Sequence, residues 1–182
     1  MGGDEGDDRL LARIAEGDRK AFGVVMERHL DRVFALARRV LLSDSDAEEV
    51  AQEVFLTLWQ KAEGWRPGRA RLSTWLYRVT LNRCLNHKAR VQRRYSSLED
   101  EATIPDRDPP AEQRLIAAQR QAQVSAAIAA LPERQRMAVS LTYVAGVSNA
   151  EAAAAMEISV KALEALLVRA RRSLRAALAV ED

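Results

Sequence analysis

A chain of 182 residues with a formal net charge of +2 is long enough for one ordinary domain or two small ones. Its single cysteine, Cys84, excludes a disulfide framework within the chain. No apolar run approaches the roughly 20 residues of a membrane-spanning helix, and the acidic first ten residues do not form a signal peptide. We therefore expect a soluble, cytoplasmic protein. No stretch alternates like a strand, so an all-α fold is predicted.

Charge is strongly segregated along this near-neutral chain. Residues 66–94 hold nine basic residues and no acidic one, whereas residues 95–115 hold six acidic and two basic residues. A second group of basic residues lies between Lys161 and Arg175. Two basic patches separated by an acidic segment indicate two contacts with a polyanion.

The acidic segment also divides the chain. We expect a disordered N-terminus over residues 1–8, a helical domain over 9–94, a flexible Pro-containing linker over 95–111, and a second helical domain over 112–182. The linker is interpreted as a solvated tether. The alternative is that it folds back on the basic patches when nucleic acid is absent.

Four helices are predicted in the first domain: a short one that ends near Gly17, a long one over residues 21–41, a third from Asp46 and a fourth from Ser73 to about Arg94. On the third helix one face is apolar and should be buried: Ala47, Val50, Ala51, Val54, Phe55, Leu58 and Ala62. Leu56 lies on the opposite face among carboxylates and amides. That face is either an ordinary solvated surface or a partner-binding surface with an apolar centre.

The fourth helix combines aromatic, amide and basic side chains. An apolar patch of Trp75, Leu76 and Val79 is followed by Asn82, Asn86 and Arg90 at a spacing of four residues, after a basic loop with the sequence RPGRARLS. Arginines contact phosphates, and amides contact base edges or unstacked bases. The helix is therefore predicted to bind nucleic acid, although a solvated basic helix has the same composition. Trp75 and Tyr77 are expected in the core, the alternative being that they stack on bases, and the role of Trp65 is left open.

The second domain is predicted to end in a helix-turn-helix. A helix over about residues 112–131 precedes one that begins at Pro132 and ends at Gly146. Ser148 and Glu151 have capping-box spacing. After the turn MEIS, a basic helix runs from Val160 to about Leu178, with Ser159 as its N-cap.

Four stretches, in this order, resemble the extracytoplasmic-function (group IV) sigma factors: DAEEVAQEVFLTLWQKAEGW, STWLYRVTLNRCLNHKARVQRR, LPERQRMAVSLTYVAGVSNAEAAAAMEISV and VRARRSLR. The resemblance implies two helical domains, called regions 2 and 4, on a flexible linker. It further implies a protein that binds core RNA polymerase, directs it to specific promoters of a stress- or signal-responsive regulon, and helps to melt the −10 element. An inhibitory anti-sigma factor is the expected further partner.

The resemblance also assigns functions to individual residues. The set expected to dock on the β′ clamp helices of the polymerase is Asp46, Glu49, Gln52, Glu53, Leu56, Trp59 and Gln60. The set expected to bind the −10 element, with Asn82 reading a flipped-out base, is Arg66, Arg69, Arg71, Ser73, Asn82, Arg83, Asn86 and Arg90. The set expected to bind the −35 element, in the domain that also meets the β flap, is Ser159, Lys161, Glu164, Ala165, Val168, Arg169 and Arg172. No catalytic residue, cofactor or metal is implied.

The sequence departs from the family pattern in two places. Glu164, Ala165 and Leu166 stand where members commonly have a basic–small–basic triplet, so the preferred −35 sequence should differ; alternatively, Glu164 only faces solvent beside Lys161. Glu157 stands where a glycine usually makes the turn, and a left-handed conformation, if it is kept here, costs a residue other than glycine about 1–2 kcal/mol.

Three other classes of protein remain as alternatives. A stand-alone helix-turn-helix repressor or activator would leave the Leu56 face without a function. An enzyme acting on nucleic acid has little to use, because the chain has only two histidines and one cysteine. A helical adaptor would show no salt-sensitive DNA binding. His29 is expected on a helix surface and Cys84 in the core.

Overall fold

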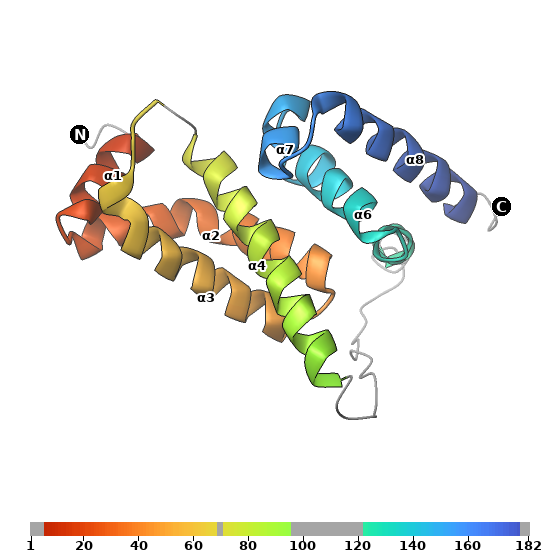
Figure 1. Cartoon of the computed structure of the whole chain (residues 1–182), viewed down its shortest axis with the longest axis horizontal. Coiled ribbons are helices and arrows are strands. Elements are labelled where there is room, and N and C mark those ends of the chain that lie inside the picture. Colours follow the sequence, from red (N-terminus) through yellow and green to blue (C-terminus); the bar gives the residue numbers. More distant parts are fainter. Residues whose placement is uncertain (1–5, 69–70, 96–121, 179–182) are drawn as a thin grey trace, which may run out of the picture.

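The structure is a computed structural model that describes residues 6–68, 71–95 and 122–178, with side chains up to residue 93 in the second range. Within these ranges every regular element is a helix. The helices form two groups, one from each half of the chain (Figure 1). This confirms the predicted all-α fold with two helical domains.

The N-terminal group contains α1 (Asp7–Ala15), α2 (Arg19–Leu41), α3 (Asp44–Lys61), a short 3-10 turn η1 (Ala62–Gly64) and α4 (Leu72–Tyr95). α2 begins at the N-cap Asp18, whose side chain accepts from two backbone N–H groups, and Ser43 caps α3 by accepting from the backbone N–H of Asp46. Gly17 has a φ of 86°, a left-handed conformation that glycine adopts without strain, and it ends α1.

The first residues of α1 correct the predicted N-terminal boundary. Asp7 and Asp8 were expected in a disordered segment over residues 1–8, of which residues 1–5 lie outside the described ranges. Asp7 instead starts α1 and lies 2.9 Å from Nε2 of His29, while Asp8 accepts from Trp65 Nε1. His29, expected on a helix surface, is consequently buried.

α2 and α3 pack against each other and against α4, and their core follows the predicted pattern. All seven residues of the predicted apolar face of α3 are buried. On α4, Tyr77 and Cys84 are buried as well, and Trp75 is half-buried against the core. The face of α3 that carries Leu56 remains outside this core.

The C-terminal group begins with a helix over residues 122–129, which is the described part of the helix predicted over 112–131. It continues with α6 (Glu133–Val139), a π-helical turn η2 (Ser140–Val144), α7 (Asn149–Ala155) and α8 (Val160–Leu178). The predicted capping box of Ser148 and Glu151 is present. Glu157 has a φ of 54°, so the turn before α8 keeps a left-handed residue without glycine.

The two groups pack against each other in this structure. α7 contacts α4, and α6 contacts α2 (Figure 1). Two ion pairs cross the boundary: Lys88 Nζ lies 2.6 Å from Glu133 Oε1, and Arg71 Nη1 lies 3.2 Å from Glu151 Oε1. The helix of the first domain that was predicted to bind nucleic acid is therefore partly covered by the first helix of the helix-turn-helix. Of the predicted linker over residues 95–111, all except Tyr95 lies outside the described residues.

Candidate polymerase and nucleic-acid interfaces

The outer face of α3 presents an exposed leucine with polar neighbours. The side chain of Leu56 is 57% exposed, and Glu49, Gln52 and Gln60 are exposed on the same helix. Trp59 is half-buried because its ring packs edge-on against Phe22, with 5.2 Å between the ring centroids. A large aliphatic side chain exposed to this degree on a helix suits contact with a partner.

The polar stripe of α4 lies at the surface. Asn82 and Asn86 are exposed, and Ser73 is half-buried at the start of the helix. Arg66 is exposed in the loop before α4, whereas Arg69 lies outside the described residues. Two side-chain amides are thus presented one helical turn apart, with an arginine in the preceding loop.

Two arginines of the predicted −10 set point towards α3. Arg83 lies 3.3 Å from a carboxylate oxygen of Glu53 and also donates to the hydroxyl of Thr57, at 3.0 Å. Arg90 Nη2 donates to Glu49 Oε1 at 2.7 Å. Two residues expected to bind DNA are therefore paired with two residues expected to bind polymerase, a connection that the sequence did not indicate because α3 and α4 are separate helices.

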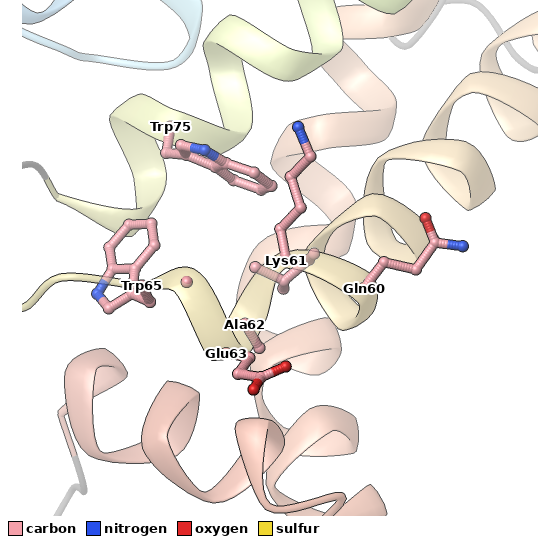
Figure 2. A pocket seen from close by; sticks show the side chains of 8 residues that line it. Gln60, Lys61, Ala62, Glu63, Trp65 and Trp75 are labelled. Atoms are coloured by element: carbon pink, nitrogen blue, oxygen red, sulfur yellow. The ribbon is translucent and has the colours of Figure 1, made fainter.

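An open groove of about 580 Å³ lies between the end of α3, η1 and the start of α4. Trp65 and Trp75 line it with their rings edge-to-face, 6.1 Å between centroids, and Lys61 and Gln60 extend from its rim (Figure 2). Trp65, Lys61 and the groove itself were not predicted as functional. Trp75 and Asn82 are seven residues apart, so they lie on the same side of α4, roughly 10 Å apart along its axis.

Arg71, also in the −10 set, is turned towards the second domain. It meets Glu151, the third residue of α7. The hydrogen bonds from Ser148, with a smaller contribution from Arg71, hold the pKa of Glu151 below its ordinary value. The carboxylate of Glu151 therefore caps α7 and joins the two domains at once.

The helix-turn-helix presents its second helix, α8, to the surroundings. Ser159 caps the helix, with 3.2 Å between its hydroxyl and the backbone nitrogen of Ala162. All other members of the predicted −35 set are exposed: Lys161, Glu164, Ala165, Val168, Arg169 and Arg172. Leu163, Leu167 and Ala170 are buried on the opposite face and fix the rotation of α8. The structure therefore brings the predicted base-facing residues together on one free face.

Together, a four-helix domain with a basic aromatic helix and a helix-turn-helix with an exposed basic helix define a two-domain, DNA-binding class of protein. The sequence matches the family profiles of Sigma-70 region 2 over residues 25–94 and of Sigma-70 region 4 over residues 121–174. The chain belongs to the RNA polymerase sigma factors, in the extracytoplasmic-function group.

Individual relatives agree with this assignment. The chain is 30% identical to the RNA polymerase sigma factor CnrH of Cupriavidus metallidurans over 98% of its own length and 97% of that protein. It is 29% identical to the ECF RNA polymerase sigma-E factor of Escherichia coli over 92% of both chains. The solved structure of CnrH in complex with the cytosolic domain of CnrY superposes with a TM-score of 0.72, at 28% identity, over 98% of this chain and all of that one.

Membership in this family settles the class of activity. A sigma factor is a transcription initiation factor that binds core RNA polymerase and directs it to promoters, so the stand-alone repressor is excluded as the main function. None of the described helices is long and apolar enough to cross a membrane.

Proposed function

We propose that the outer face of α3 is the surface that docks on the clamp helices of core polymerase. The observation that carries this proposal is Leu56, which stands 57% exposed between Gln52 and Gln60. Burying such a side chain contributes about 1.5–3 kcal/mol, and the surrounding carboxylates and amides supply a polar rim. Asp46, Glu49 and Glu53 complete this rim on the side that faces α4.

The −10 element binds, on this proposal, along α4 and the loop before it. Melting DNA costs roughly 1.4 kcal/mol per base-pair step, and each base that stacks on an aromatic ring returns about 1–3 kcal/mol. Asn82 reads an unstacked base, and the groove lined by Trp65 and Trp75 holds a neighbouring one on the same side of the helix. Arg66 and Arg71 contact the phosphates.

The −35 element binds the exposed face of α8. Its arginines and lysine hold the backbone of the duplex, while Glu164, Ala165 and Val168 face the bases in the major groove. The exposed face of α8 needs no rearrangement for −35 recognition, whereas Arg71 of the −10 set is paired with Glu151 of α7 and must leave that pair to contact a phosphate.

An anti-sigma factor is the proposed regulator. The solved structure of CnrH contains the cytosolic domain of CnrY. The solved structure of RpoE from Bartonella quintana contains the anti-sigma factor NepR; RpoE is 21% identical to this chain, so that likeness concerns the fold alone. The similarity to CnrH in that complex covers 98% of this chain and therefore includes both domains. We place this regulation in the cytoplasm, where the polymerase works.

The experiment is run-off transcription with purified core polymerase on a pool of promoter fragments. Wild type, Leu56→Arg and Asn82→Ala are compared, with Val24→Arg as a matched control that places the same charge at another exposed aliphatic side chain. We expect Leu56→Arg to weaken core binding at least about tenfold, because it loses the apolar contact. Asn82→Ala should bind core normally and fail to select or open promoters.

Two results would overturn the residue assignments. Core binding by Leu56→Arg as tight as that of Val24→Arg would remove α3 from the interface. Normal promoter selection by Asn82→Ala would remove Asn82 from base recognition. Failure of the wild type to initiate anywhere would argue against the function itself.

A further inference from the structure

Three side chains with metal-ligating atoms converge where the start of α3 meets α4. Asp46 and Glu49 are three residues apart on α3 and so project from the same face, and His87 faces them from α4. Single ligand atoms of these three residues all lie within 4.8 Å of one another. Asp46 Oδ1 is 3.3 Å from His87 Nε2.

The histidine nitrogen in this cluster is buried and has no hydrogen-bond partner. His87 is only 7% exposed, and although Asp46 is near its Nε2, the pair does not have the geometry of a hydrogen bond. A polar nitrogen removed from water without a partner is costly to the fold. A cation bound between Nε2 and the carboxylate would satisfy both groups.

We propose that Asp46, Glu49 and His87 bind one divalent transition-metal ion, with Zn²⁺ the best match. In a tetrahedral site with bonds of about 2.0–2.1 Å, neighbouring ligand atoms lie about 3.3–3.4 Å apart, and the Asp46–His87 separation has this value. One imidazole and two carboxylates suit zinc or a similar borderline ion better than Mg²⁺ or Ca²⁺, which prefer oxygen ligands alone. A water molecule takes the fourth position.

Arg90 competes with the ion for the same two residues. Its Nη2 donates to Glu49 Oε1 at 2.7 Å and lies 3.0 Å from His87 Nδ1. A guanidinium only donates, so Nδ1 accepts in this state and the imidazole proton is on Nε2. Metal binding at Nε2 requires the proton on Nδ1, and Arg90 must then move away. Glu53, whose carboxylate is 3.9 Å from Arg90, offers an alternative partner.

This competition would connect the ion to transcription, a step that rests on the proposed function. The ion takes two carboxylates from the surface proposed to dock on polymerase, and it releases Arg90 from Glu49 towards the surface proposed to bind the −10 element. Metal binding should therefore weaken docking on core polymerase, and it removes the Glu49 contact of Arg90, so that Glu53 alone competes with DNA for this arginine.

The test measures binding to the full chain and requires neither polymerase nor DNA. Metal-free protein is titrated with Co²⁺, whose visible absorption reports tetrahedral coordination, and with Zn²⁺ in competition with a chromophoric chelator. We expect one ion per chain in the wild type. Asp46→Asn and His87→Asn should each weaken binding at least about tenfold, whereas Arg90→Gln should tighten it because the competitor is gone.

The matched control is His29→Asn, which removes the only other histidine of the chain, itself also buried beside an aspartate, Asp7. It should bind Co²⁺ like the wild type. Circular dichroism of each metal-free variant shows if a loss of metal binding comes from a loss of folding. If His87→Asn does not fold, the result of Asp46→Asn, a substitution at a half-buried position, decides if the site exists. Absent binding in the wild type, or equal binding by folded Asp46→Asn, would overturn the site and leave the sigma-factor function untouched.

Discussion

Lys88 Nζ of α4 lies 2.6 Å from Glu133 Oε1 of α6, and this ion pair joins the domain that contains the proposed −10 surface to the domain that contains the helix-turn-helix. The second bridge, between Arg71 and Glu151, uses an arginine of the proposed −10 set itself. When the two domains are packed together, the positive charges of Lys88 and Arg71 are thus paired with carboxylates and attract DNA less strongly.

The first prediction concerns this closure. Both side chains of the Lys88–Glu133 pair are about one-third exposed, at 35% and 36%, so the pair is worth only about 0.2–1 kcal/mol. Lys88→Glu replaces attraction with repulsion and should shift the population towards open molecules. Small-angle X-ray scattering should then show a larger radius of gyration than for the wild type.

The charge-swapped variant Lys88→Glu/Glu133→Lys is the control for this measurement. It keeps the same two residue types in exchanged positions and should restore the compact form. An unchanged radius in Lys88→Glu would show that the remaining contacts, those of α4 with α7 and the Arg71–Glu151 pair among them, hold the domains together without the Lys88–Glu133 pair.

Cys84 provides a second, independent report on this region. The thiol is fully buried, and burial raises its pKa to about 12. At pH 8 the reactive thiolate is then roughly a thousandfold scarcer than in an ordinary cysteine. We expect Ellman's reagent to modify native protein very slowly and urea-unfolded protein at once. Rapid modification of the native chain would contradict the burial.

Glu53 couples the two proposed surfaces of the first domain. Its carboxylate pairs with Arg83 and lies near Arg90. Glu53→Gln should remove the carboxylate that neutralises Arg83 on α4. Single-stranded −10 DNA should then bind the free protein more tightly and with a steeper salt dependence. Fluorescence anisotropy of a labelled oligonucleotide measures this.

Glu48→Gln is the matched control, because Glu48 is exposed on the same helix and makes no ion pair with any described residue. It removes the same charge without releasing an arginine. Equal effects of the two substitutions would mean that only net charge matters and that the Glu53–Arg83 pair has no particular influence on DNA binding.

The pH dependence of the second domain should follow Glu151. Its hydrogen bonds from Ser148 lower its folded-state pKa from the ordinary 4.5. A lowered pKa means that the carboxylate stabilises the folded chain fully above the ordinary value, and this stabilisation is lost as the pH falls through the folded-state pKa. Between about pH 6 and pH 3 the unfolding temperature should therefore fall less in Glu151→Gln than in the wild type, because the glutamine keeps the cap but cannot ionise. Parallel curves for the two proteins would exclude Glu151 as a source of the pH dependence.

Local patterns in the sequence were sufficient to predict the helices and the N-caps Ser148 and Ser159, whereas the N-caps Asp18 and Ser43 were not predicted. The period of apolar residues located the buried face of α3, and Ser148 with Glu151 located the start of α7, because these signals involve residues within one or two turns. The position of the turn at Glu157 followed from the helix-turn-helix pattern, and the structure adds that this residue is left-handed.

The side-chain partners between helices could not be predicted in this way. His29 is buried because Asp7 of another helix meets it, and His87 faces Asp46 from 41 positions further along the chain. Arg83 and Arg90 were expected to be free for DNA, but they lie beside α3, whose carboxylates attract them. Such pairs depend on how helices are rotated and packed, and no short spacing in the sequence records that.

The last prediction concerns Glu164 on α8. The sequence left open whether this residue reads a base or only faces solvent beside Lys161. The structure exposes Glu164 on the same face as Ala165 and Val168, and no ion pair joins it to Lys161 among the described residues. A carboxylate in the major groove accepts from the N4 amino group of cytosine, and such a contact contributes about 1–3 kcal/mol of discrimination.

Glu164→Gln should therefore lose roughly fivefold or more of a cytosine preference at one −35 position, because the neutral amide binds cytosine more weakly. Transcription from a library of −35 variants, sequenced from the run-off products, measures the preference at every position. Glu157→Gln, which removes an exposed acid from the turn instead, should leave the profile unchanged. Identical profiles for wild type and Glu164→Gln would show that Glu164 only faces solvent and that the neighbouring side chains determine the sequence read by α8.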